Sequence, residues 1–404
     1  MELLGQELRK IWRPGLVACI AALGVLYYLL FPSFLIGHFN NGATAQADYD
    51  LAAGWVARFG PTMEPEERAQ LDAQLAAEQE EFGRMAAALP AASGAGLADF
   101  DAYEAFREAH YAAASQEATP QQAEAFQAEE ALIWEVMDNT NFFVIQQLQS
   151  FMDCYDSAAQ RLPAQDAEAS PYTPAQQARI AELEAGARGY LPWHVRENTA
   201  AYGSWLAVWT VLSVVLLLSP TLVRDRLHRV RPLQWASRRG RGAVDVQMAA
   251  GMLSALVLSG ANLAVYGALF ASCGPLAFAE CPLYSWVWGG YAWFDWTFGQ
   301  YLAVLAALLV ALGLAAGAAA LFLSRFSGSY VAMLLKALPL FVALGALFGA
   351  WLLDGPFYFK LPYAQAASFV PAGTEFACAG VLLAACVALV VGACAVQRRR
   401  ELLA

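Results

Sequence analysis

The sequence predicts an all-α polytopic membrane protein with six transmembrane helices and a large helical extracytoplasmic insert between the first and the second. Of its 404 residues, 59% are hydrophobic and only 15% are charged, whereas a typical soluble domain is about 25% charged. The charge is also divided unevenly, because residues 37–198 hold 26 acidic and 8 basic residues while the rest of the chain holds 9 acidic and 16 basic ones. Such asymmetry follows the two sides of a membrane and does not indicate nucleic-acid binding.

Residues 1–36 are expected to form a short amphipathic helix and then the first transmembrane helix. The opening MELLGQELRKIWRPG carries three basic residues ahead of an apolar run from about residue 15 to residue 36. That run is long enough to cross a hydrocarbon core of about 30 Å. A cleaved signal peptide is the alternative, since Ala43-Thr44-Ala45 resembles a cleavage site. The apolar stretch of a signal peptide is only about 7–15 residues long, so the longer run favours an uncleaved anchor.

Residues 37–198 are predicted to form an extracytoplasmic all-α domain. Apolar residues recur in it at helical spacing, as in the series Leu71, Leu75, Phe82, Met85 and Leu89. The pairs Thr119-Pro120 and Thr173-Pro174 each open a further predicted helix, because threonine caps a helix start and proline suits its first position. Alternating apolar and polar residues, the pattern of strands, are almost absent.

Residues 199–404 are expected to hold five more transmembrane helices. Their apolar runs cover about residues 205–223, 246–271, 298–323, 330–353 and 376–396. Two aromatic-rich segments, 272–297 and 354–373, lie on the outer side and suit the membrane interface.

Helix packing is expected at two small-residue motifs in these spans. Gly313-x-x-x-Gly317 and Gly345-x-x-x-Gly349 place glycines one turn apart, which allows helices to approach closely. Asn262, near the middle of the third span, is positioned to hydrogen-bond across helices.

Two cysteines in the outer segment 272–297, Cys273 and Cys281, are candidates for a short disulfide. Spacing along the chain does not show the geometry that a disulfide needs, so a bridge and two free thiols both stay open. Four others, Cys19, Cys378, Cys386 and Cys394, lie in apolar spans and suit packing.

The segment 224–241, RDRLHRVRPLQWASRRGR, is the most basic part of the chain. It holds seven arginines and one acid, Asp225, and lies between two apolar runs. Moving arginine across a bilayer is costly, so short basic loops stay on the cytoplasmic side. The loop therefore predicts a multi-pass protein of the plasma (cytoplasmic) membrane with both termini inside. It is either a topology signal alone or also a docking site.

No catalytic motif is found in the sequence. The three lysines all follow residues other than glycine, so the GxxxxGK[ST] phosphate loop is not present. The four histidines are scattered without HExxH, and no cysteine pair has zinc-site spacing. We expect no enzyme activity and no cofactor or metal in this chain.

Three features together resemble the permease subunit of an ABC exporter of the second type. These are the opening ELRKIWRP, the large outer insert within a six-span chain, and the segment PLQWASRRGRGAVDVQM (232–248). In the family a cytoplasmic Ser-[Thr/Ser/Lys]-x-Gly-Arg run precedes the third span, and here that run is Ser237-Arg238-Arg239-Gly240-Arg241. One departure is Gln247, where related sequences often carry lysine.

The resemblance implies that this loop, with Trp235 as an aromatic anchor, docks a separate ATP-hydrolysing subunit. It further implies a second permease, identical or homologous, in the lipid bilayer, with ATP and Mg on the partner ATPase. Two other classes remain open: a membrane-anchored sensor or receptor whose outer helical domain binds a ligand or partner, and an intramembrane enzyme.

Topology can be tested by labelling engineered cysteines on intact cells with an impermeant thiol reagent. The arginine distribution predicts labelling within residues 100–110 and protection within residues 398–402 until the cells are opened. Labelling of the C-terminal site alone would contradict the predicted orientation.

Overall fold

The computed structural model describes residues 2–113, 120–161, 173–230, 242–286, 291–349, 353 and 372–400. These residues form helices, and apart from two isolated bridges they contain no strand. The predicted all-α class is therefore confirmed for the described chain. Four of its helices are long and apolar enough to cross a membrane, and one bent pair raises the number to five. The chain is thus a multi-pass membrane protein by helix length and composition, and the sixth span stays a prediction.

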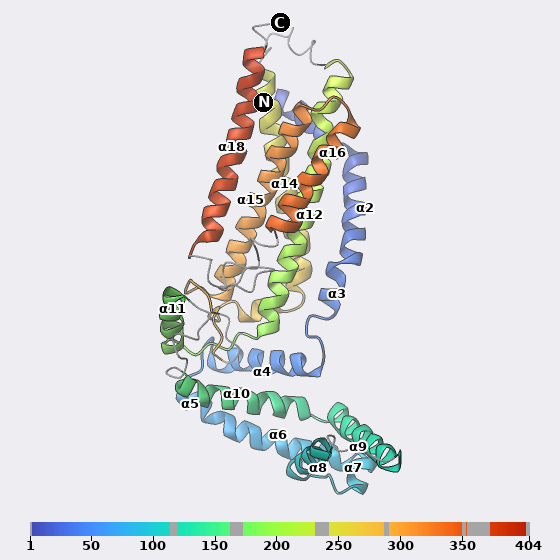
Figure 1. Ribbon diagram of the computed structural model, residues 1–404, viewed down its shortest axis with the longest axis vertical. Coiled ribbons are helices and arrows are strands. Elements are labelled where there is room, and N and C mark those ends of the chain that lie inside the picture. Colours follow the sequence, from blue (N-terminus) through green and yellow to red (C-terminus); the bar gives the residue numbers. More distant parts are fainter. Residues whose placement is uncertain are drawn as a thin grey trace.

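The four long helices lie side by side in one bundle (Figure 1). They are α12 (Trp193–Leu227), α14 (Gly242–Ala271), α15 (Phe298–Arg325) and α18 (Thr374–Arg400). The bent pair consists of α1 (Glu2–Ile11) and α2 (Pro14–Leu30), which meet at an angle of 49°. The backbone at Arg13 is extended ahead of Pro14, because proline pushes the residue before it out of the helical region.

Three predicted spans differ from the observed helices. The first is broken, since α2 stops at Leu30 and Pro32 starts the short helix α3 (Pro32–Gly37). The second starts earlier than residue 205, because α12 begins at Trp193 within the predicted insert. In the fifth, α16 (Tyr330–Phe341) passes into the π-helical segment η2 (Val342–Gly349), and residues 350–352 lie outside the described ones.

Close packing around α12 and α15 forms the centre of the bundle. Of the candidate spans α12 is the most buried and α18 the least. A Cβ atom on Gly317 would lie 2.6 Å from the Cβ of Ala255, and one on Gly313 would overlap Ser259. A Cβ atom on Gly349 would lie 3.1 Å from Ala207. Because glycine has only a hydrogen in place of a side chain, Gly313 and Gly317 let α15 approach α14 closely, and Gly349 lets η2 approach α12.

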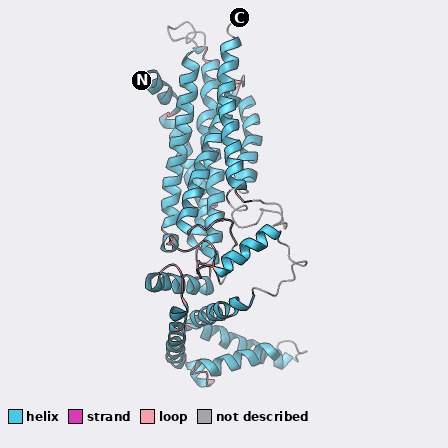
Figure 2. Ribbon diagram, turned by 90° about the vertical axis from the view of Figure 1, so that its left-hand side faces the viewer, coloured by secondary structure: helices cyan, strands magenta, loops and turns pink. Residues whose placement is uncertain are grey.

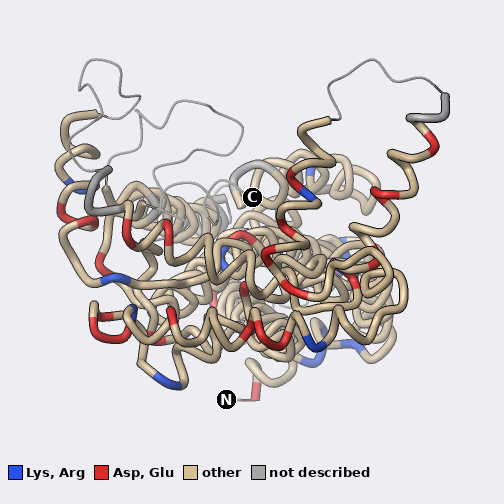
Figure 3. Tube along the Cα trace, turned by 90° about the horizontal axis from the view of Figure 1, so that it is seen from below, with Lys and Arg blue, Asp and Glu red and all other residues tan. Residues whose placement is uncertain are grey.

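The insert is a chain of helices beyond one end of the bundle (Figures 1 and 2). It comprises α4 (Ala43–Phe59), α5 (Pro65–Arg68), α6 (Gln70–Ala87), α7 (Pro90–Gly94), α8 (Phe100–Ala113), α9 (Pro120–Asn139), α10 (Phe142–Arg161) and α11 (Pro174–Ala185). Thr173 caps α11 by accepting a hydrogen bond from the backbone of Gln176. Seen from below, acidic residues are spread over these helices (Figure 3).

Two hydrophobic cores divide the insert. Trp55, Phe151 and Tyr190 belong to the core that continues into the bundle. Phe82, Tyr103 and other residues of α6 to α10 form a second core at the far end, which we call the distal lobe. The layer nearest the bundle is therefore packed as part of it, whereas the distal lobe has a core of its own.

The insert is fastened to the segment between α14 and α15, which includes the short 3₁₀ helix η1 (Pro275–Phe278). The Tyr49 hydroxyl donates to the Gly274 carbonyl at 2.9 Å, and the Trp286 amide donates to Gly189 at 2.8 Å. The Arg188 guanidinium lies 4.2 Å from the ring centre of Trp286, a cation–π contact. Nearby, burial raises the pKa of Asp48 to about 7, because a buried carboxylate loses its hydration.

The glycine contacts predict how single methyl groups act on bundle stability. Gly317→Ala places a Cβ against Ala255 and should destabilise the bundle by about 1–3 kcal/mol. Gly392→Ala in α18 is the matched control, because a Cβ there meets no atom within 4 Å and alanine favours helix by about 1 kcal/mol. Unfolding midpoints in detergent give the comparison. Equal midpoints for the two variants would show that the α14–α15 contact is loose.

Candidate functional site

The predicted docking residues Trp235, Ser237, Arg238, Arg239, Gly240 and Arg241 lie outside the described residues, which stop at 230 and resume at 242. The helices on either side of this loop place its two ends. The last turn of α12 and the first turn of α14 lie with α1 at the end of the bundle remote from the insert (Figure 1). Five side chains lie around these two ends and form what we call the loop base: Glu7, Lys10, Asp225, Arg226 and Gln247.

The amphipathic helix α1 is held against α14 and α12. Ile11 on its inner face is only 2% exposed. The next residue, Trp12, donates a hydrogen bond from its indole to the Ser254 hydroxyl of α14 at 2.9 Å. An apolar face and this hydrogen bond therefore fix α1 to the bundle, while Arg9 on its other face is exposed.

A buried charge cluster joins α1, α12 and α14. The Lys10 amine lies 2.6 Å from the Glu7 carboxylate and 3.8 Å from that of Asp225. The Gln247 amide donates to the same Asp225 oxygen at 3.1 Å. Glu7, Asp225 and Gln247 are buried. An acid in the last turn of α12 faces the negative end of the helix dipole, so Asp225 depends on these partners.

The end of α12 is also joined to the end of α15. The Arg226 guanidinium donates to the carbonyls of Arg325 and Ser327, each at 2.8 Å. These carbonyls stand at the C-terminus of α15, where helix carbonyls have no partner within the helix, and a cation there is favourable. Arg226 thus caps α15 from the neighbouring helix.

A serine of α15 reinforces this junction next to the proline in α12. The Ser324 hydroxyl donates to the Ser219 carbonyl at 2.8 Å and accepts from the amides of Leu222 and Val223. Pro220 lies between these groups, and a proline leaves nearby backbone groups of a helix without their usual partners. Ser324 therefore supports α12 where its own hydrogen bonding is weakest.

The described chain enters the loop through a strained residue. Arg229 has φ of +54°, directly after the cap residue of α12, His228. Helices commonly end with a left-handed residue at this position, and it is usually glycine. The left-handed conformation costs a residue with a Cβ about 1–2 kcal/mol. Arg229 thus adopts, at this C-terminus, the left-handed conformation that glycine usually supplies.

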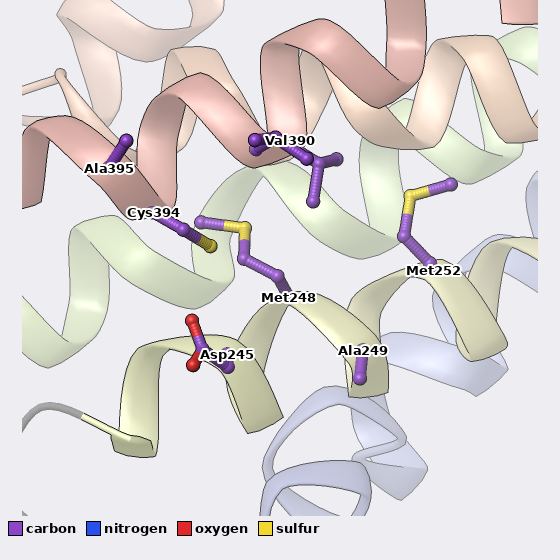
Figure 4. Close-up of a pocket in the computed structure, with 8 residues that line it drawn as sticks. Asp245, Met248, Ala249, Met252, Val390, Cys394 and Ala395 are labelled. Carbon is purple, nitrogen blue, oxygen red and sulfur yellow. The ribbon is translucent and has the colours of Figure 1, made fainter.

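A cleft of about 580 Å³ opens between α14 and α18 beside the loop base. Met248 and Met252 of α14 face Val390 and Cys394 of α18 across it, and Asp245 lies at its end nearest the loop (Figure 4). The cleft exists because α18 packs chiefly on α15.

Of the two alternatives left open for Cys273 and Cys281, the structure has the free thiols. Cys273 and Cys281 are both free thiols. The Cys273 sulfur is turned to the carbonyl of Ile36 at 3.8 Å. Cys281 is buried, its backbone is paired with Phe278 and Phe298, and burial raises the pKa of its thiol to about 12. The two side chains are thus committed to different contacts.

Two polar residues of the spans, Asn262 and Lys336, make different contacts. The Asn262 amide donates to Ser213 at 2.8 Å and its oxygen accepts from the Trp209 indole at 3.1 Å, so it bonds across helices as expected. The Lys336 amine points back towards the start of α16, 3.5 Å from the Phe326 carbonyl.

Sequence reasoning did not find the loop base, although two signals were present. Asp225 is the single acid among seven arginines, and Gln247 stands where related sequences often carry lysine. In space the lysine near Asp225 is Lys10, which comes from a helix more than 200 residues away. Among the residues that the structure describes, no three His, Cys, Asp or Glu side chains are grouped to hold a metal ion.

No protein-family model, no curated protein and no solved structure matches this chain significantly.

The charge cluster predicts that Lys10 supports the fold through two buried acids. Lys10→Met leaves Glu7 and Asp225 buried without the cation and should destabilise the protein by about 1–3 kcal/mol. Arg9→Met is the control. The Arg9 side chain is exposed, so its removal should change the stability little. Adding Glu7→Leu to Lys10→Met should recover part of the loss if the two residues are coupled. Thermal unfolding in detergent tests this, and equal effects of the two methionine variants would contradict it.

Proposed function

We propose that this chain is the permease subunit of an ATP-driven ABC transporter, an exporter of the second type. Residues 224–241 would dock a separate ATPase subunit that binds ATP and Mg, and a second permease would complete the translocation path. In this proposal the loop and both termini face the cytoplasm and the insert faces outward across the plasma membrane.

The loop base is the observation that supports the proposal most. A transporter driven from outside needs an element that receives motion and passes it to its spans. Here α12, the helix before the loop, is joined to α1 by Lys10, to α14 by the hydrogen bond from Gln247 to Asp225, and to α15 by Arg226. A displacement of the loop would therefore move four helices together. A loop serving as a topology signal requires charge but no such connections.

A second candidate function is favoured by the distal lobe. Its core is separate from the core of the bundle, as expected of a domain that binds a ligand or partner outside the membrane. A membrane-anchored sensor or receptor would use the lobe for recognition and the loop base for signalling. In a permease the same lobe would receive cargo or hand it over.

The two functions differ in whether the loop recognises an ATPase by shape. We expect Trp235→Ala and Gly240→Val, expressed together with a candidate ATPase subunit that carries a Walker A motif, to weaken co-purification of that ATPase about tenfold, which corresponds to about 1.4 kcal/mol. The tryptophan offers an aromatic anchor, and the glycine allows a backbone conformation that valine strains. Arg239→Lys keeps the charge and is the control for membrane insertion.

Unchanged co-purification of both uncharged variants would overturn docking and leave the topology role alone. If the parent chain brings down no ATPase at all, the sensor function is favoured.

A further inference from the structure

A groove of about 380 Å³ lies between α2 and α14, in the half of α14 nearer the insert. Ala21 and Val25 of α2 form one wall, and Ala261 and Val265 of α14 form the other. Trp209 of α12 and Asn262 of α14 also line it. Its lining is almost wholly apolar, and it belongs to none of the contacts of the loop base.

Hydrogen bonds fix the walls of this groove. The Tyr266 hydroxyl of α14 donates to the Gly24 carbonyl of α2 at 2.9 Å. Tyr27 of α2 donates to the Trp205 carbonyl of α12 at 2.9 Å. A Cβ atom on Gly24 would lie 2.9 Å from the Trp209 ring, so α2 already touches α12 as closely as it can. The groove is therefore preformed, because α2 cannot close onto α14 without breaking these contacts.

The groove opens towards the hydrocarbon of the membrane. Val25 and Val265, at its two rims, are 62% and 60% exposed, and both belong to candidate spans. Water has no partners in an apolar groove within a bilayer, and an empty one loses the contacts of its lining atoms. The bilayer supplies only one apolar material at high concentration, the acyl chains of its lipids.

We propose that the groove binds one acyl chain of a bilayer lipid. A methylene group is about as large as a water molecule, roughly 30 Å³, so the groove holds about a dozen methylenes. A transmembrane helix of a second copy would enter the groove only with side chains, and the crosslinking arm of the test below distinguishes that occupant from lipid. The proposal rests on membrane insertion alone and does not depend on the transport function.

The bound chain also shields a polar layer. Asn262 and Trp209 hydrogen-bond to each other beneath the groove, and a hydrogen bond strengthens when water is excluded. The lipid would therefore stabilise the contact between α2, α12 and α14. Relative to the surrounding bilayer, the gain from binding the chain is that of better packing.

Photolabelling of the full chain in vesicles tests this proposal. The probe is a phosphatidylcholine with a diazirine in the middle of one acyl chain. We expect the α2 and α14 segments at the groove to be labelled at least threefold more, per exposed apolar residue, than α16 and α18. Ala21→Leu and Ala261→Leu, alone and together, fill the groove and should remove that excess. Ala385→Leu adds the same volume on the exposed face of α18 and should not.

Two outcomes would overturn the proposal. One is labelling that follows exposure alone in all spans of the parent chain. The other is an excess at the groove that survives both leucine substitutions. Labelling of α16 and α18 in the same sample reports whether each variant has folded, and the two single variants replace the double one if it has not. Disulfide crosslinking between copies of a Val265→Cys variant, with no lipid label at the groove, would assign it to a second copy instead.

Discussion

The contact of α12 with α15 and α14 is the constraint on which the rest of the structure depends. In a bilayer no hydrophobic force drives helices together, so association rests on close packing and hydrogen bonds. Gly313 and Gly317 provide the first, because any side chain there would overlap α14. Asn262 provides the second, through its bonds to Trp209 and Ser213. Three helices lie outside this centre: α2, α16 and α18. Each packs on the centre with one face and exposes a long apolar face on its other side.

Polar contacts then divide the molecule into parts of different stiffness. At the loop end, Lys10, Gln247, Arg226 and Ser324 connect α1, α14 and α15 to α12. At the other end, Tyr49 and Arg188 connect the near layer of the insert to the segment between α14 and α15. The distal lobe has its own core beyond that layer. The helices α6 and α10 contribute residues to both cores, Leu71 and Leu148 to the core of the bundle and Phe82 and Phe142 to that of the lobe, so they join the lobe to the near layer.

Much of the fold could be predicted because it follows from local sequence. Apolar length predicts the long helices, and Thr173 and Thr297 cap helices where their sequences indicate. Predictions failed where distant residues decide. The start of α12 is polar, so its hydropathy hides a helix that Asn198 anchors to the Phe39 carbonyl. The break at Pro32 was visible in the sequence but lay within an apolar run. The cluster of Lys10, Asp225 and Gln247 brings together three helices.

Helix α2 links the loop base at one end of the bundle with the insert at the other. At one end it continues through the bend at Arg13 into α1 and the loop base. At the other end it leads through α3 into the insert. Along its length it packs on α12, whereas the hydrogen bond that holds it to α14 across the groove comes from Tyr266. Single interhelical hydrogen bonds in membranes contribute only about 0.6 kcal/mol, so this side of α2 is weakly held by protein. A helix that links the loop base with the insert is thus the one whose position the surrounding lipid can influence most.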